Sequence, residues 1–201
     1  ANYRAQLVAA STAPAADTAS VSAWRREIAL IDAGELLAPT VPVTESGRRR
    51  IAGRMLQLHL ERNAVTGSDL WLFDPQTRLL LAGDLVTLPV PFFDTACPAR
   101  WRSALNRLAA VRFMRLVPGH GPPLGSRQFA VYRRAFGALL DCAATTRSKE
   151  ECAAGWLHDI GDLVPAGEQA FARSLLDYYL TEKGDRFISC EAPETGDGPQ
   201  R

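Results

Sequence analysis

The sequence is poor in histidine and contains no long run of apolar residues. Only three of its 201 residues are histidines, so a metal site rich in this residue has few positions to draw on. Every apolar run falls short of the roughly 18 to 20 residues that a membrane-spanning helix needs. The four cysteines are too widely spaced for a CxxC zinc knuckle, which excludes that class of structural zinc site. They are Cys97, Cys142, Cys152 and Cys190.

An excess of one charge sign is also lacking. There are 23 Lys and Arg residues against 22 Asp and Glu, for a formal net charge of +1 and a pI near 7.9. The arginines are scattered, and the cluster Arg48 to Arg50 follows Ser46 and Gly47 as in a turn. We therefore expect no nucleic-acid partner and no membrane span, and we expect a small-molecule substrate; the sequence does not specify an oligomeric state.

A 47% hydrophobic composition is enough for a sizeable core. We expect a single domain over residues 1–190 and a disordered tail over 191–201, where the sequence turns polar and rich in Gly and Pro. The chain has neither an initiator Met nor a signal-like apolar region, which favours a processed protein or a fragment.

Two of the cysteines flank a polar connection between two helical patterns. Cys142 and Cys152 enclose the residues ATTRSKEE, so a disulfide between them is sterically reasonable. Such a bond would favour a periplasmic or secreted protein. Four free buried thiols in the cytoplasm are the equal alternative.

The hydrophobic periodicity predicts mixed α/β structure. In RMLQLHLER, apolar Leu56, Leu58 and Leu60 alternate with polar residues, which indicates a strand whose polar face carries a solvated His59. DLWLFDP and RLLLAGD then read as a β-hairpin, and an amphipathic helix from Pro98 leads to the strand FMRLV. Helical spacing predicts further helices near residues 3–10, 21–37, 129–144, 150–157 and 168–183.

Two polar residues flanked by glycine follow strands of this crossover unit. Asp84 lies in LLLAGDLV and His120 in RLVPGHG. If the two strands share a sheet, the carboxylate and the imidazole emerge at the same edge. This pair suits a zinc, iron or manganese ion, and it equally suits a His/Asp acid–base pair.

AGD after a β-hairpin, then an amphipathic helix with a Trp, then VPGHG resembles the second half of the metallo-β-lactamase superfamily over Leu56 to Leu124. The resemblance implies an α/β fold, namely the second half of an αββα sandwich with added C-terminal helices. It also implies that Asp84 bridges two metal ions, zinc or alternatively iron or manganese, and that His120 binds one of them. The implied activity is metal-assisted hydrolysis of an ester, thioester, lactone or lactam.

Two departures limit the resemblance. Val65 precedes Thr66 where the family has a ligand histidine, and only the amide of Asn63 could stand in. The HxHxDH motif of the family's first half is absent, because no histidine precedes His59. We therefore expect an N-terminally truncated hydrolase that is inactive as this fragment, or a degenerate homologue kept for binding or as a scaffold.

Other roles remain open for the aromatic residues. Phe92 and Phe93, in a proline-bounded loop after Asp84, could form a substrate-pocket wall or could be core. A helical adaptor built on residues 125–183 would need an exposed apolar stripe that includes Trp156, Tyr178 and Tyr179. Helices that follow a crossover unit more commonly cover the sheet.

Overall fold

The computed structural model describes residues 2–14, 17–34 and 41–182, and the expected tail over 191–201 lies outside them. The chain forms two compact units, residues 1–43 and 44–201. The first contains helix α1 (Asn2–Ser11) and helix α2 (Thr18–Asp32), as the periodicity predicts. Helix α2 begins where the Asp17 side chain accepts a hydrogen bond from the Ser20 backbone N–H. Arg4 pairs with Asp32 and joins the two helices.

The second unit contains a five-stranded sheet in which the strands lie side by side in chain order. The strands are β1 (Gly47–Ile51), β2 (Arg54–Arg62), β3 (Ser68–Asp74), β4 (Leu79–Thr87) and β5 (Arg115–His120). Neighbours are antiparallel except β4 and β5, which are parallel and joined by helix α3 (Pro98–Ala109). The hairpin and the crossover unit predicted from the sequence are thus confirmed. Strand β1, whose arginines we assigned to a turn, was missed.

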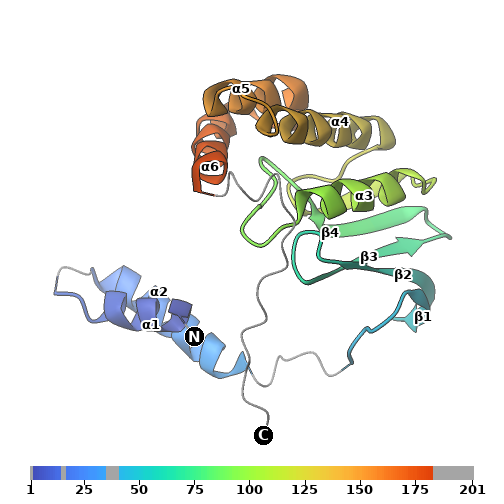
Figure 1. Ribbon diagram of the computed structural model, residues 1–201. Coiled ribbons are helices and arrows are strands. Elements are labelled where there is room, and N and C mark those ends of the chain that lie inside the picture. Colours follow the sequence, from blue (N-terminus) through green and yellow to red (C-terminus); the bar gives the residue numbers. More distant parts are fainter. Residues whose placement is uncertain (1, 15–16, 35–40, 183–201) are drawn as a thin grey trace, which may run out of the picture. The chain divides into compact units, whose positions relative to one another are not determined.

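The helices of the second unit lie on one side of the sheet, with α3 next to β4 and with α4 (Ser126–Ala143), α5 (Lys149–Ile160) and α6 (Gln169–Glu182) packed in succession beyond it (Figure 1). Two short 3-10 helices, η2 (Gly161–Leu163) and η3 (Ala166–Glu168), precede α6. Trp156 and Tyr179 are buried in this layer, with 1% and 3% of their surface exposed. Trp156 and Tyr179 therefore do not belong to the exposed apolar stripe that a helical adaptor requires, because both side chains are buried in the core.

The two faces of the sheet differ in what covers them. Trp71, Leu80 and Leu116 point toward the helices and are buried in the core. The register places leucines on the opposite face, where Leu58 pairs with Leu72 and Leu60 with Leu70. We call this the leucine face; it comprises Leu56, Leu58, Leu60, Leu70, Leu72, Leu79 and Leu81.

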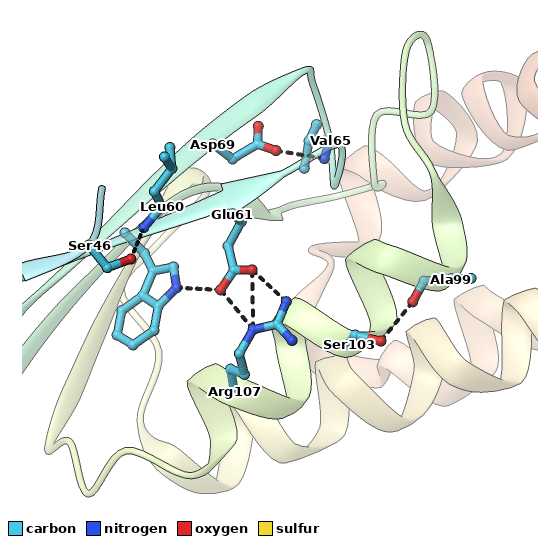
Figure 2. Close-up of polar contacts among 9 residues, drawn as sticks. Ser46, Leu60, Glu61, Val65, Asp69, Ala99, Ser103 and Arg107 are labelled. Atoms are coloured by element: carbon cyan, nitrogen blue, oxygen red, sulfur yellow. Dashed lines mark hydrogen bonds and ion pairs between the residues drawn. The ribbon is translucent and has the colours of Figure 1, made fainter. Parts of the chain in front are cut away.

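The polar residues of β2 lie on the helix side of the sheet. Glu61 is only 6% exposed and accepts hydrogen bonds from the Trp71 indole and from Arg107 of α3 (Figure 2). His59 stacks on Trp71 with ring centroids 3.7 Å apart, and burial lowers the pKa of its imidazole. His59 is half-buried, so the expectation of a solvated side chain is met only in part: alternation identified the two faces of β2, and the stacked Trp71 ring covers one side of the imidazole.

Cys142 at the end of α4 and Cys152 in α5 form a disulfide bond, so one of the two alternatives for these cysteines is confirmed. Cys97 is also disulfide-bonded. In the part of the chain that the structure describes, no helix is both long and apolar enough to cross a bilayer.

Candidate functional site

Asp84 lies at an irregularity in the pairing of β4 with β5. The strands pair regularly from Leu79 to Leu81, and the register then shifts between Gly83, which pairs with Pro118, and Thr87, which pairs with His120. A bulge of this kind redirects the side chains of the bulged strand. Strand β4 continues to Thr87, so Asp84 projects from within the strand and not from its end.

His120 is the last residue of β5 and faces Asp84. Its backbone oxygen accepts a hydrogen bond from the Leu88 N–H at 3.0 Å, which fixes the strand end against the chain that leaves β4. His120 Nε2 lies 3.6 Å from Asp84 Oδ1. The two side chains are 54% and 51% exposed, so the pair is open to a ligand from solvent. The crossover unit thus brings the two predicted residues together.

Glycine is required beside this pair. A Cβ on Gly119 would lie 2.1 Å from Asp84 Oδ1 and 2.8 Å from the carbonyl carbon of Gly83. Gly121 has a φ of +102°, and its Cβ would meet Leu88 at 2.8 Å. Only a residue without a side chain allows β5 to approach Asp84 this closely.

The loop after β4 places one of the two phenylalanines beside the pair. Phe92 is half-buried and contacts His120 edge-on, with ring centroids 5.1 Å apart. Phe93 is 2% exposed and packs in the core against Trp101 and Tyr179. The two neighbouring rings therefore point to different places, and Phe92 is the one that borders the candidate site.

Aromatic residues of the helices hold the end of β4 and the loop after it through their polar atoms. Trp101 donates to Leu85 O at 2.9 Å, and Trp156 donates to Pro89 O at 3.1 Å. The Tyr179 hydroxyl donates to Asp94 at 2.7 Å. Tyr132, whose phenol pKa is raised by burial, accepts a hydrogen bond from the Thr87 N–H.

Helical periodicity predicts that these four rings are buried, but it does not predict which backbone atoms they contact. Sequence reasoning therefore missed that they position β4 and the loop after it. Their only sequence signal is that Trp and Tyr, which carry a polar atom, occupy core positions of the helices.

The loop between β2 and β3 carries the position where the family resemblance expects a third histidine. Val65 is buried at 5% exposure, and its backbone N–H donates to Asp69 at 3.0 Å (Figure 2). Its carbonyl accepts a hydrogen bond from Thr95 at 2.9 Å, which ties this loop to the one that carries Phe92. Asn63 is exposed, with a φ of +53°. Position 65 therefore contributes packing and no metal donor.

The separation of Asp84 and His120 suits a shared ion better than a direct bond. Hydrogen bonds from a ring nitrogen to oxygen span about 2.7–3.2 Å, whereas two donors on one tetrahedral zinc ion lie about 3.4 Å apart. A catalytic zinc nevertheless needs three protein ligands. Among the described residues, no group of three or more His, Cys, Asp or Glu side chains could hold a metal ion. The residues present thus fit part of a metal site and not a complete one.

Comparison with solved structures gives the fold. A double mutant of the sec-alkyl sulfatase PisA1 matches with a TM-score of 0.51 and 20% identity, over 71% of this chain and 26% of that one. A metallo-β-lactamase from Pontibacter korlensis matches with a TM-score of 0.44 and 20% identity, over 59% of this chain and 62% of that one. A metallo-β-lactamase family protein from Thermus thermophilus matches with a TM-score of 0.40 and 21% identity, over 80% of this chain and 62% of that one.

In fold, this chain is similar to the sec-alkyl sulfatase PisA1 and to solved structures that are described as metallo-β-lactamases. At these identities the likeness to the metallo-β-lactamases is one of fold. The chain spans less than two thirds of the length of these solved structures. No protein-family model and no curated protein matches the sequence.

Proposed function

We propose that this chain contributes Asp84 and His120 to the metal centre of a metallo-β-lactamase-fold hydrolase whose remaining ligands come from a segment outside this sequence. The observation that supports the proposal is the convergence of the two side chains, 3.6 Å apart and half-exposed at one sheet edge. The expected ion is zinc, with iron or manganese as alternatives. The expected substrate is a small ester, thioester, lactone or lactam.

Each residue near the pair has a definite part in this proposal. Asp84 and His120 hold the ion, and Gly119 leaves room for the carboxylate. Phe92 presents an apolar edge to a substrate beside His120. When bound, such an ion supplies an activated water for hydrolysis. Because the described residues provide two donors, we expect no hydrolysis from this chain alone.

A non-catalytic binding or scaffold domain is the second candidate. It predicts that His120 donates a hydrogen bond directly to Asp84 and that the pair is structural. The 3.6 Å separation is too long for that bond and favours the first candidate.

Metal retention tests the proposal, and the chain offers a matched control. His158 and Asp159 form a second surface His/Asp pair, 3.1 Å apart on α5. Because two donors bind zinc only weakly, the measurement is made at equilibrium: after equilibrium dialysis against zinc, elemental mass spectrometry is expected to find an excess of zinc on the protein side of the membrane for the wild type and for Asp159→Ala. Zinc should fall to background in Asp84→Ala and in His120→Ala. Equal zinc in all four proteins, or background zinc in the wild type, would contradict the proposal and leave the likeness as one of fold.

We also propose an oxidising compartment, periplasmic or secreted, for the mature protein. The disulfide between Cys142 and Cys152 supports this, because such bonds persist where thiols are not kept reduced. Alkylation of whole cells followed by mass spectrometry measures the oxidised fraction. A fully reduced pair in the native host would exclude this location.

A further inference from the structure

Helices α3 and α4 carry an excess of positive charge that the whole chain does not have. Their sequences, PARWRSALNRLA and SRQFAVYRRAFGALLDCA, contain six arginines and a single acidic residue, Asp141. The formal net charge of the entire chain is only +1. The arginines are Arg100, Arg102, Arg107, Arg127, Arg133 and Arg134. The surface of this helix pair is therefore locally basic on a nearly neutral protein.

Part of this charge lines a groove between the two helices, which lie side by side in Figure 1. The groove has a volume of about 530 Å³, within the range of ligand sites. Its lining combines apolar residues, including the exposed Ala130 and Ala138, with arginines from both helices. A Cβ added to Gly137, in the same groove, would meet nothing within 4 Å, so the space above Gly137 is open.

The arginines of the groove differ in how many of their guanidinium N–H groups already donate hydrogen bonds to this chain. Arg102 crosses from α3 to α4, where it donates to Gly137 O at 2.9 Å and to Asp141 at 2.6 Å. Arg133 donates one hydrogen bond, to the Asn106 side chain at 2.8 Å. Arg134 is exposed and makes no hydrogen bond or ion pair with any residue that the structure describes. Arg133 and Arg134 thus retain donors for a ligand.

We propose that this groove binds an acidic peptide segment of a partner protein. Guanidinium groups bind carboxylates through paired hydrogen bonds, and Arg102 already binds the Asp141 carboxylate in this groove. The apolar residues of the groove lining suit leucine-like side chains that alternate with the acidic side chains of the peptide. This interaction is separate from the proposed metal site, because none of the groove residues belongs to that site.

Asp141 decides between a peptide and a nucleic acid. Its side chain is 71% exposed, so it can accept further hydrogen bonds from a ligand in the groove. This carboxylate repels phosphates and peptide carboxylates alike, but a peptide backbone also has N–H donors for it, whereas a phosphodiester backbone has only acceptors. The same residue therefore favours one class of polyanion over the other.

Fluorescence anisotropy with a labelled peptide of sequence Glu-Leu-Glu-Glu-Leu-Glu-Glu tests the proposal. The adjacent residues Arg25 and Arg26 on α2 are also exposed and do not line the groove, so their double variant loses the same charge without changing the groove lining. We expect R133Q/R134Q to weaken peptide binding at least tenfold and R25Q/R26Q to change it less than twofold. Equal weakening by the two double variants would mean general charge attraction and would overturn the proposal.

A substitution that fills the groove separates the contribution of its shape to peptide binding from the contribution of its charge. Gly137→Trp keeps every charge but occupies the open space, so it should weaken peptide binding at least tenfold. Gly137→Ala adds only a Cβ, which meets nothing within 4 Å, and should bind as the wild type does. Absence of peptide binding to the wild type would overturn the proposal. So would tighter binding of a single-stranded thymidine oligonucleotide of equal charge.

Discussion

Glu61 is a single carboxylate whose ionisation is coupled to folding. Burial raises its pKa, but the hydrogen bonds from Arg107 and Trp71 outweigh burial and hold the pKa below its usual value. A lowered pKa in the folded state gives a stabilisation that is fully present above the unfolded value, about 4.3. That stabilisation is lost as the pH falls through the lower folded value.

Glu61→Gln is therefore expected to lower the free energy of unfolding by about 1–3 kcal/mol at neutral pH. The amide keeps one acceptor but turns an N–H group toward Arg107. The difference from the wild type should shrink as the pH falls below about 4. Urea unfolding at neutral and acidic pH measures both quantities. Glu45→Gln, whose side chain is 76% exposed, is the control, and an equal effect of the two variants would contradict this role of Glu61.

Gly119 is the residue on which the approach of β5 to Asp84 depends most. Gly119→Ala would place a Cβ 2.1 Å from Asp84 Oδ1, so either the carboxylate or the strand must move. We expect a loss of about 2 kcal/mol or more in unfolding free energy, and loss of the zinc retained by the wild type. Gly155→Ala in α5 meets nothing within 4 Å and should be neutral or stabilising by about 1 kcal/mol. Wild-type stability and zinc retention in Gly119→Ala would contradict the close approach.

At this scale the sequence could predict that Asp84 and His120 lie near one another, because each follows an apolar run and is flanked by a glycine that marks a turn; their role as metal ligands stays a prediction. Their separation could not be predicted, since it depends on the register shift between β4 and β5. Val65 was recognisable as a departure from the family pattern. Its burial and the hydrogen bond from Thr95 to its carbonyl arise from tertiary packing, so no local sequence pattern could predict them.

Among the elements, long helices with one apolar stripe were predictable and the edge strand was not. Helix α3 begins at Pro98, as the sequence indicates, because proline fits a first helical position. Strand β1 consists largely of exposed arginines, so it has no alternating pattern to detect. Strand β1 is stabilised by its pairing with β2, and this pairing cannot be predicted from the residues of β1 alone.

The connection between α4 and α5 is closed covalently. Because a disulfide across a short loop restricts the unfolded chain, we expect C142S/C152S to lower the free energy of unfolding by about 2–3 kcal/mol. Guanidinium unfolding of this double variant is the measurement. Serine substitution is preferable to a reductant, because Cys97 is also disulfide-bonded and would be reduced too. An unchanged midpoint would show that the helices hold the connection closed without the bond.

At the scale of the whole molecule, helices α3 to α6 pack on the other side of the sheet and leave the leucine face uncovered. Leu70 is 38% exposed on it, and a small apolar cavity of about 180 Å³ is lined by Leu56, Leu72, Leu79 and Leu81. Apolar surface of this kind promotes association in water. The sequence could predict this liability once the family resemblance implied half of a sandwich.

Leu70→Lys is expected to reduce self-association as the protein concentration rises, with little loss of stability. Light scattering coupled to size-exclusion chromatography measures the effect. Met114→Lys replaces an apolar side chain that is 66% exposed and lies outside the leucine face, so it should associate as the wild type does. Equal association of both variants and the wild type would show that this face does not mediate contact between copies.

The chain places both residues of the candidate site in one crossover unit, β4–α3–β5, within residues 79–120. A single uninterrupted stretch of coding sequence therefore specifies the strand that presents the carboxylate, the helix that spans the distance and the strand that presents the imidazole. Recombination that moves this stretch moves both groups with their relative geometry intact. A change elsewhere in the chain can then alter the chemistry of the site while this heritable unit keeps the carboxylate and the imidazole together.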